Sequence, residues 1–409
     1  MTVARSFETV CSDLDLRRHV TLGFERIEAL LDLLDHPERD LRVAQVVGTN
    51  GKGTTAVALA ATLELAGHPS GVYLSPHVLS YVERMMVRGT FVSEGAFAAT
   101  MGEVLDLADA NNIPASQFEL LTAGALGLFR SEGLSWAVLE AGLGARHDAT
   151  TAARPEAVVL TNVGLEHTEY LGDTIEEIAR EKLASVPLNG TLILGSDEPW
   201  LVGLARSECR RRGARLVEVS PDSDPPHAPT VTYAARNVAL GIRAAEVLLD
   251  REFGPGDRKE VFERVSGALP ARFERHEVRG VPVVVDGGHN PAGLAAALGA
   301  VREIYGDRPL GVVFGALRDK DIGSMLTALK NEASSLALTR PVNERAANPG
   351  WVLREFDPRD REGRSAAVVA DSGEALERVV EEMKQAGGVV LVTGSLYTAA
   401  EVLGRLREG

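Results

Sequence analysis

The amino-acid sequence predicts an α/β fold in two domains, each built around a mostly parallel sheet. Short apolar runs alternate with longer helical patterns, which is typical of parallel strands connected by helices on both faces of a sheet. The length of 409 residues, 45% of them hydrophobic and 25% charged, suits two domains with sizeable cores. In such sheets the functional loops lie at the carboxyl ends of the strands.

The first series of strands and helices predicts a domain over residues 1–270. Its apolar runs are, in order, LRVAQVVG, WAVLEAGLG, EAVVLTNVG and GTLILGS. Three polar segments follow the ends of such runs: GTNGKGTT, EAGLGARHD and TNVGLEHTEY. Because the carboxyl ends of parallel strands share one edge of a sheet, we expect a single crevice to collect all three.

A second series begins after LPARFER and predicts a smaller, Rossmann-like domain over residues 271–409. Its expected strands are VPVVVDGGHNPAG, PLGVVFGALRDKD, SSLALT, SAAVVADS and GGVVLVTGSLYTAAEVL. Pro270 interrupts helical continuity, so we expect the boundary near residues 268–280. Two α/β layers joined by a short hinge commonly close over a ligand at their interface.

The bulk composition excludes several classes of protein. A formal net charge of −15 argues against nonspecific nucleic-acid binding through a broad basic surface. Cys11 and Cys209 are too few for a disulfide framework or a cysteine-based zinc site. No apolar run approaches the roughly 18 residues of a membrane span, and the N-terminus lacks a signal-peptide core. We therefore expect a cytoplasmic protein, with an exposed loop in the Pro- and Asp-rich segment 220–230.

The segment VVGTNGKGTT at residues 46–55 predicts a phosphate-binding loop between a strand and a helix. Its glycines allow the backbone to curl with N–H groups pointing inward, Lys52 adds a point charge, and the helix expected at about Thr54–Ala66 presents its positive end. These glycines are Gly48, Gly51 and Gly53.

The spacing in this loop differs from the usual G-x-x-x-x-G-K-[ST], because Val46 stands in place of the first glycine. The loop is a shorter G-x-x-G-K-G-T variant. A glycine-rich turn can also be a simple tight connection. The lysine followed by Thr54 and Thr55, in a strand–turn–helix setting, favours a nucleoside triphosphate.

Two further side chains of the first domain, Glu140 and His167, are candidates for metal chemistry. Glu140 ends the strand WAVLE and can coordinate Mg²⁺, although a capping or solvated role is the alternative. His167 follows another strand end, and a lone histidine is more often structural, but beside Glu140 a second-metal role becomes reasonable. From its position alone, Lys182 is predicted to be an ordinary solvent-exposed lysine on a helix.

In the second domain, VVVDGGHNP places Asp286 and His289 at a strand end. Asp286 can accept from a ribose hydroxyl, and Asn290-Pro291 can begin the next helix, although a plain capping turn explains the same spacing. Arg272 lies at the expected hinge and can reach a phosphate group. A single arginine carries little specificity by itself.

Several ordered motifs extend across almost the whole chain. They are GTNGKGTT, SPHVLSYVERM, QFELLTAGALGLF, LEAGLGARHDAT, NVGLEHTEYLGDTIEEIAREK, LPARFER, VVVDGGHNP, FGALRDKD and VTGSLYTAAEV. Together they resemble the folylpolyglutamate synthase/dihydrofolate synthase family, which is similar in design to the Mur ligases. The SPH segment and the terminal GSLY point to the folate branch.

The resemblance implies an N-terminal P-loop-type ATPase domain and an ATP-dependent ligase that joins the amino group of L-glutamate to dihydropteroate, to a (tetrahydro)folate, or to both. ATP would phosphorylate the pterin-linked carboxylate, and the glutamate nitrogen would then displace phosphate from the acyl phosphate. The first step needs positive charge around the phosphoryl group. The second needs a held amine and exclusion of water.

The same resemblance assigns nucleotide and metal contacts. The nucleotide contacts are Gly51, Lys52, Gly53, Thr54, Asn237, Arg272 and Asp286. The metal-binding positions are Thr54, Ser75, Glu140, His167 and Lys182. Lys182 matches a lysine that is carbamylated in the family, which would turn a cation into a ligand for a second Mg²⁺. The expected catalytic residues are Lys52, Lys182 and His289, and the expected cofactors are ATP and two Mg²⁺ ions, with K⁺ as a further candidate.

The pterin side of the site is implied by Leu22–Arg26 and by a second set of positions. That set is Gln117, Phe118, Glu119, His147, Asp148 and Ala149. The chain departs from the family at three places: Ala145 and His147 replace a glycine and a leucine, Leu183-Ala184 replaces AG, and DGGHNP replaces DGAHNP. The histidine lies where pterin contacts are expected.

Two other functions compete with the folate ligase. A Mur-type ligase of cell-wall synthesis would need a separate UDP-binding domain, whereas the phosphate loop begins only 47 residues into the chain. A nucleotide-binding ATPase or switch would not need Lys182, the SPH segment and DGGHNP together. We expect small-molecule substrates, no nucleic-acid or membrane partner, and a monomer.

Overall fold

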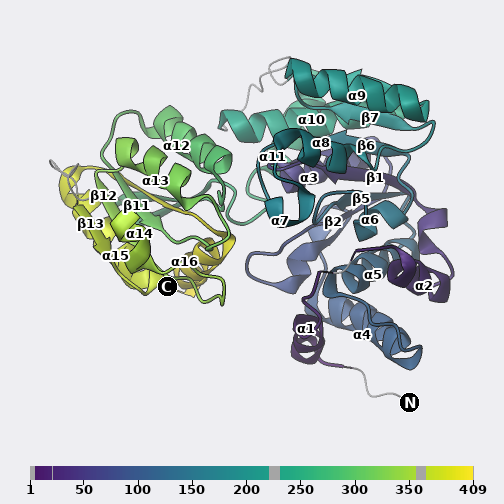
Figure 1. The fold of residues 1–409 in the computed structure, drawn as a ribbon, viewed down its shortest axis with the longest axis horizontal. Coiled ribbons are helices and arrows are strands. Elements are labelled where there is room, and N and C mark those ends of the chain that lie inside the picture. Colours follow the sequence, from purple (N-terminus) through teal and green to yellow (C-terminus); the bar gives the residue numbers. More distant parts are fainter. Residues whose placement is uncertain (1–4, 21, 221–230, 356–364, 409) are drawn as a thin grey trace. The chain divides into compact units, whose positions relative to one another are not determined.

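The structure is a computed structural model that describes residues 5–20, 22–220, 231–355 and 365–408. Apart from Ser220, the loop expected at 220–230 lies outside these residues. The described chain forms two compact units (Figure 1). The first comprises residues 5–220 and Ala234–Ser266, and the second comprises Val231–Tyr233 and residues 267–408. The two-domain α/β fold with mostly parallel sheets is confirmed.

The N-terminal unit contains an eight-stranded sheet in the order β4-β3-β2-β5-β1-β6-β7-β8. Its strands are β1 (Arg42–Val47), β2 (Ser70–Tyr73), β3 (Met85–Val87), β4 (Thr90–Phe91), β5 (Trp136–Glu140), β6 (Ala157–Leu160), β7 (Thr191–Leu194) and β8 (Arg215–Glu218). The six strands β2, β5, β1, β6, β7 and β8, in this order across the sheet, pair in parallel, as expected. The edge strand β4 and its neighbour β3 pair antiparallel.

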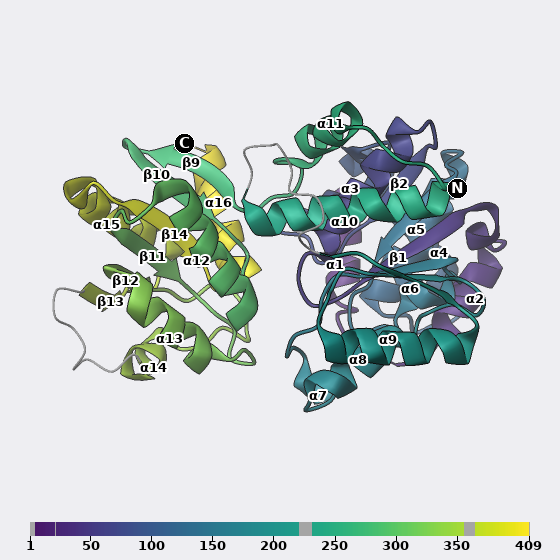
Figure 2. The ribbon, with the colours of Figure 1, turned by 90° about the horizontal axis from the view of Figure 1, so that it is seen from above.

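Helices cover both faces of this sheet (Figure 2). They are α1 (Phe7–Asp15), α2 (Glu25–Leu33), α3 (Lys52–Leu65), α4 (Glu94–Ala110), α5 (Gln117–Ser131), α6 (Ala149–Ala152), α7 (Thr168–Leu171), α8 (Ile175–Leu183), α9 (Pro199–Arg212), α10 (Thr232–Leu249) and α11 (Pro255–Val265), with short 3-10 turns at Pro37–Asp40 and Tyr81–Arg84. One face packs against α1, α2, α4 and α5, and further along against α8 and α9. Helices α3, α10 and α11 lie on the other face. In the described part of the chain, no helix has the length and apolarity needed to cross a membrane.

The second unit contains a six-stranded sheet in the order β13-β12-β11-β14-β10-β9, parallel except for the β9–β10 pair. Its elements are β9 (Glu274–Val278), β10 (Val281–Val285), α12 (Pro291–Tyr305), β11 (Leu310–Phe314), α13 (Ile322–Glu332), β12 (Ser335–Leu338), α14 (Pro349–Glu355), β13 (Ser365–Val368), α15 (Ser372–Ala386), β14 (Val389–Thr393) and α16 (Leu396–Glu408). Helices α15 and α16 pack on one face, and α12 and α13 pack together on the other (Figure 1).

The helices that carry candidate site residues begin at clear caps. A capping box of Thr174 and Glu177 starts α8, and a box of Ser116 and Glu119 starts α5. Asn290 caps α12 through its side chain, with Pro291 as the first helical residue. The expectation that Asn290-Pro291 begins a helix is therefore confirmed.

Helix α3, which follows the phosphate loop, is enclosed on all sides. Every residue from Thr55 to Leu63 is buried, and its alanines allow close approach of neighbouring backbones. Gly241 of α10 marks the closest approach. A Cβ atom at this position would lie 2.7 Å from both the Thr55 carbonyl oxygen and the Leu59 nitrogen. The small residue fixes the distance between the two helices.

We expect Gly241→Ala to lower the free energy of unfolding by about 1–3 kcal/mol, because backbone atoms of α3 cannot move away locally. The matched control is Gly203→Ala in α9, where a Cβ atom meets nothing within 4 Å. There we expect a gain of about 0.5–1 kcal/mol from helix propensity. Urea unfolding of both variants tests this, and an equal effect at the two positions would contradict the packing argument.

Candidate active site

The carboxyl ends of β1, β5 and β6 lie side by side in the N-terminal unit. β1 pairs with β5 on one side and β6 on the other, with Val46 opposite Glu140 and Val47 opposite Leu160. The three polar segments that follow these strands therefore leave the sheet at the same edge, as the sequence predicted. This edge is the candidate site of the first unit.

The phosphate loop needs its glycines at two positions. Gly48 and Gly51 have φ angles of +146° and +83°, which side-chain-bearing residues rarely adopt. A side chain at Gly48 would also collide with the Thr161 hydroxyl, and one at Gly51 with the Asn237 side chain. The N-terminus of α3 follows directly at Lys52. The family resemblance assigned Asn237 to the nucleotide, and its side chain lies against the phosphate loop at Gly51.

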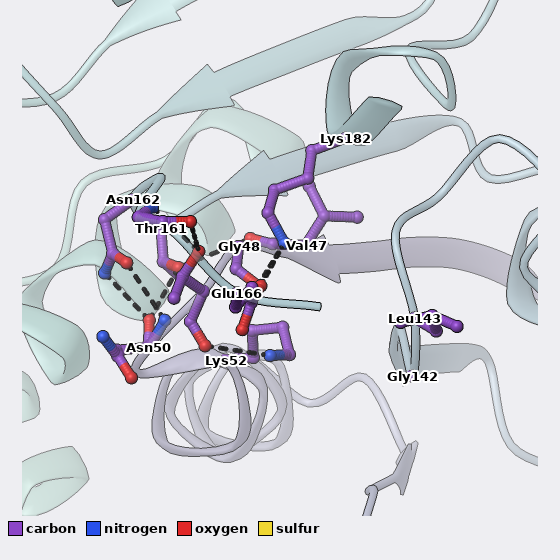
Figure 3. A network of polar contacts seen from close by, with 12 residues as sticks. Val47, Gly48, Asn50, Lys52, Gly142, Leu143, Thr161, Asn162, Glu166 and Lys182 are labelled. Atoms are coloured by element: carbon purple, nitrogen blue, oxygen red, sulfur yellow. Dashed lines mark hydrogen bonds and ion pairs between the residues drawn. The ribbon is translucent and has the colours of Figure 1, made fainter. Parts of the chain in front are cut away.

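Two residues after β6 hold the loop in shape (Figure 3). The Asn162 side chain accepts from the Asn50 N–H at 3.0 Å and donates to the Asn50 carbonyl at 2.9 Å. The Thr161 hydroxyl donates to the same carbonyl at 2.8 Å. The backbone N–H and carbonyl of Asn50 are therefore fixed by the residues that follow β6. Sequence reasoning missed both residues, although the pair TN at a strand end was a visible signal.

Lys182 forms a buried ion pair against the backbone of this loop (Figure 3). Its ammonium group lies 2.6 Å from a Glu166 carboxylate oxygen and 2.9 Å from the Gly48 carbonyl. The side chains are 2% and 8% exposed, so the reading of Lys182 as a solvated helix lysine is wrong. Lys52 donates to the Thr49 carbonyl at 3.1 Å. Two cations and one carboxylate thus converge on the loop.

The ion pair shifts the pKa of both partners. Burial by itself would raise the pKa of Glu166, but the charges of Lys182 and Lys52 outweigh it and lower that pKa to about 2. Burial lowers the pKa of Lys182 below the usual lysine value, with Glu166 opposing the shift. Sequence reasoning missed Glu166, which stands beside His167 in the same loop.

The expected metal-binding positions supply oxygen atoms around the strand ends. Glu140 is 5% exposed and accepts from the Ser75 N–H at 3.0 Å. The buried Ser75 hydroxyl oxygen has no hydrogen-bond partner among the described residues. Thr54 lies in the first turn of α3, and His167 precedes α7 with a φ of +47°, an uncommon conformation for a residue with a side chain. A bound cation would have to fit these oxygen atoms and the positions of Thr54 and His167.

Three polar residues assigned to the substrate are used by the scaffold. The Asp148 carboxylate accepts from the N–H groups of Gly142 and Leu143 at 2.9 and 3.0 Å, and from Thr150. It is 5% exposed, and burial raises its pKa. Glu119 caps α5 and pairs with Arg26 at 3.0 Å. Gln117 donates to the Leu14 carbonyl and to the Tyr81 hydroxyl. Their contacts with substrate stay predictions.

Aromatic side chains gather beside the loop that follows β5. The His147 ring lies 6.0 Å from the ring of Phe24, which belongs to the segment Leu22–Arg26 assigned to the pterin side. Phe118 packs against Tyr73 with ring centroids 5.6 Å apart, and Ala149 is buried at the start of α6. Flat rings near one loop are suited to a flat ligand, so this placement is compatible with the predicted pterin contacts.

The residues assigned to the second unit surround the end of β10. Asp286 accepts from the N–H groups of Phe273 and Gly288 at 3.0 and 2.9 Å and from the Tyr233 hydroxyl at 2.6 Å. His289 bonds through Nδ1 to the Gly287 carbonyl at 3.0 Å, so this nitrogen carries the proton. Arg272 lies in the turn before β9. Sequence reasoning missed Tyr233.

Two family profiles match the chain in succession. The Mur ligase middle domain matches residues 46–239, and the Mur ligase glutamate ligase domain matches residues 271–396. The fold and these matches define a ligase of the Mur type. The dihydrofolate synthase/folylpolyglutamate synthase of Escherichia coli is 30% identical over 94% of this chain and 91% of its own length. The chain belongs to the folylpolyglutamate synthase/dihydrofolate synthase family.

Other relatives and solved structures agree with this family. A Haloferax volcanii relative named probable bifunctional folylpolyglutamate synthase/dihydropteroate synthase is 33% identical over 95% of this chain, which spans 49% of that protein. The ADP complex of Mycobacterium tuberculosis folylpolyglutamate synthase has a TM-score of 0.87 at 26% identity, with 98% of both chains covered. A bifunctional enzyme with Mn, AMPPNP and L-glutamate bound has a TM-score of 0.83 at 26% identity, covering 99% of this chain and 100% of its own.

His77 in the SPH segment is held as a neutral base. Its Nδ1 accepts from Arg84 Nε at 2.8 Å, and its ring packs against the Tyr81 ring with centroids 4.3 Å apart and the planes tilted by 52°. Burial, then the charges of Arg84 and Arg18, lower the pKa of His77 to about 3. Since the folded-state pKa lies below the ordinary value of 6.5, the protein loses stability as the pH falls from about 6.5 toward about 3.

We expect the ring of His77 to stay neutral from pH 8 to pH 5 in a histidine NMR titration, with its signal identified by its absence from His77→Gln. Glutamine can accept from Arg84 without titrating. The variant should therefore lose about 1–2 kcal/mol less stability than the unmodified chain between pH 7 and pH 5. A His77 signal that titrates near pH 6.5 would contradict this prediction.

Proposed function

We propose that this chain is an ATP-dependent ligase that adds L-glutamate to dihydropteroate, to a (tetrahydro)folate, or to both. The observation that carries the proposal is the buried Lys182, which lies against the backbone of the phosphate loop with 2% of its side chain exposed. A phosphate loop needs no lysine beneath it to bind a nucleotide. An additional buried amine points to chemistry beyond nucleotide binding.

The residues around the strand ends are suited to a divalent cation. The orphaned Ser75 hydroxyl and the Glu140 carboxylate are hard oxygen donors of the kind that Mg²⁺ prefers. The described residues include no group of three His, Cys, Asp or Glu placed to enclose a metal. The proposed ligands Thr54, Ser75, Glu140 and His167 would therefore share the cation with phosphate oxygens and water. When bound, Mg²⁺ supplies positive charge to the transferring phosphoryl group.

The side chains of the phosphate loop serve the first chemical step. The loop N–H groups and Lys52 would bind the phosphates of ATP and stabilise negative charge that develops as the phosphoryl group moves to the acceptor carboxylate. Gly51, Gly53 and Thr54 belong to the same loop and helix start. The nucleotide would further contact Asn237, and in the second unit Arg272 and Asp286.

The second step forms the amide bond. The glutamate nitrogen attacks the carbonyl carbon of the acyl phosphate, the carbon–nitrogen bond forms, and the carbon–oxygen bond to phosphate breaks as the amine loses its proton. We assign the proton transfer to no described side chain. His289 would help to organise phosphate transfer. Phe118, His147 and Ala149 would lie on the pterin side.

We also propose that Lys182 reacts with carbon dioxide. Its ammonium group would first lose one proton, and the amine nitrogen would then bond to the carbon of CO₂ and release a second proton, so that a cation becomes an anion able to hold a second Mg²⁺. The small, uncharged reactant suits a buried amine. The number of metal ions, a role for K⁺, the monomeric state and the cytoplasmic location stay predictions.

The ligase reaction is tested with purified protein and Mg-ATP. We expect release of ADP and phosphate only when L-glutamate and a pterin acceptor are both present, with the acceptor gaining the mass of one glutamate residue. Dihydropteroate and tetrahydrofolate are assayed separately, which distinguishes one glutamate addition from both. Glutamate-independent ATP hydrolysis without a mass gain would point to an ATPase or switch and overturn the proposal.

We expect Lys182→Ala to reduce ligase activity by about 100-fold or more, because a buried charged group next to the phosphate loop is lost. The matched control is Lys259→Ala, an exposed lysine on α11 with 73% of its side chain exposed, which should keep full activity. Circular dichroism and urea unfolding of both variants check that they fold. Partial rescue by a short-chain carboxylate would support the carbamate, and full activity of a folded Lys182→Ala would remove it.

A further inference from the structure

The turn before β9 holds two residues in a backbone conformation that their side chains disfavour. Ala271 and Phe273 have φ angles of +54° and +53°, and both are buried. A left-handed conformation costs a residue other than glycine roughly 1–2 kcal/mol. Arg272 lies between them. The turn that presents this arginine therefore exists only because neighbouring groups hold it.

Three hydrogen bonds fix this turn. The Ala271 N–H donates to a Glu274 carboxylate oxygen at 3.0 Å, and the Ala271 carbonyl accepts from the Gly287 N–H at 2.9 Å. The Phe273 N–H donates to Asp286 Oδ2 at 3.0 Å. Asp286 is the one partner among these that the proposed function also assigns to the nucleotide.

The orientation of the Asp286 carboxylate depends in turn on Tyr233. The Tyr233 hydroxyl donates to Asp286 Oδ2 at 2.6 Å, a short bond to a carboxylate that is 6% exposed. Burial, then the charge of Asp286, raise the pKa of Tyr233 well above its usual value, so the phenol keeps the proton that it donates. Sequence motifs gave Tyr233 no role.

We propose that Tyr233 is a positioning residue for nucleotide binding: its hydroxyl orients the Asp286 carboxylate, which in turn holds the strained turn that presents Arg272. The inference rests on the proposed function, since that function assigns Asp286 and Arg272 to ATP. It adds a residue that does not itself touch the nucleotide.

The arrangement also determines which oxygen of Asp286 serves the nucleotide. Oδ2 accepts from Tyr233 and Phe273, which uses both of its acceptor positions, whereas Oδ1 accepts from Gly288 at 2.9 Å. Within the described part of the chain, Oδ1 thus keeps one acceptor position for a ribose hydroxyl. Without the Tyr233 bond the carboxylate can rotate, and this preference for a ribose hydroxyl is lost.

The experiment compares Tyr233→Phe with the unmodified full-length chain, using ATP, 2′-deoxy-ATP and 3′-deoxy-ATP in the ligase assay and ADP in calorimetric titration. We expect the KM for ATP and the Kd for ADP to rise about tenfold, from the loss of a hydrogen bond to a charged group, with a smaller change in kcat. The matched control is Tyr305→Phe at the end of α12 in the same unit, which should change neither constant.

The deoxynucleotides separate positioning from general damage. The unmodified chain should discriminate against whichever deoxynucleotide lacks the hydroxyl that Asp286 accepts, and Tyr233→Phe should lose most of that discrimination. An equal loss for all three nucleotides would mean that Tyr233 is merely structural and would overturn the proposal. Thermal unfolding confirms that the variant is folded.

A double-variant cycle tests whether Tyr233 acts through Asp286. Tyr233→Phe combined with Asp286→Asn should lose no more than Asp286→Asn alone, whereas additive losses would overturn the proposal. If the unmodified chain ligates glutamate but Tyr233→Phe behaves identically, the inference alone fails. If the unmodified chain neither binds ADP nor ligates glutamate, the proposed function fails and the inference falls with it.

Discussion

The pairing of β1 between β5 and β6 is the constraint on which the candidate site depends. The phosphate loop leaves β1, but its Asn50 is held by side chains that follow β6, and its Gly48 carbonyl accepts from a lysine on α8. A loop with two glycines at positive φ has little conformational preference of its own. Its shape is therefore a property of the sheet and not of the ten-residue motif.

The arrangement of strands and helices was largely predictable because parallel strands buried on both faces appear as nearly continuous apolar runs. The alternating pattern gave β1, β5, β6 and β7 of the first unit and the parallel strands β10 to β14 of the second, but not the short parallel strands β2 and β8. It did not reveal β3, β4 or β9, since short antiparallel edge strands such as Glu274–Val278 carry charged residues and resemble loops. Burial of α3 on all sides follows from its alanines, but only the structure shows that Gly241 sets the approach of α10.

The residues of the candidate site were predictable where they belong to a sequence motif. They were not predictable where their role depends on a contact between residues far apart in the sequence. Lys182 reads as a surface residue locally, and only the approach of α8 to Gly48 buries it. Asn162, Glu166 and Tyr233 act on atoms distant in the chain, and only the pair TN at the end of β6 was a local signal, which did not identify its partner. Asp148 was assigned to the substrate by resemblance, whereas its buried oxygens are occupied by the loop that carries it.

The burial of Lys182 has a consequence for the composition of the chain. Only six of its 43 basic residues are lysines, and the other 37 are arginines, so arginine carries most of the positive charge. At position 182, however, an arginine cannot take the place of the lysine. An arginine would bring five N–H donors and a planar head into a space where the described residues offer the Gly48 carbonyl and one Glu166 oxygen. The chain therefore needs a lysine at position 182, although arginine supplies most of its positive charge elsewhere.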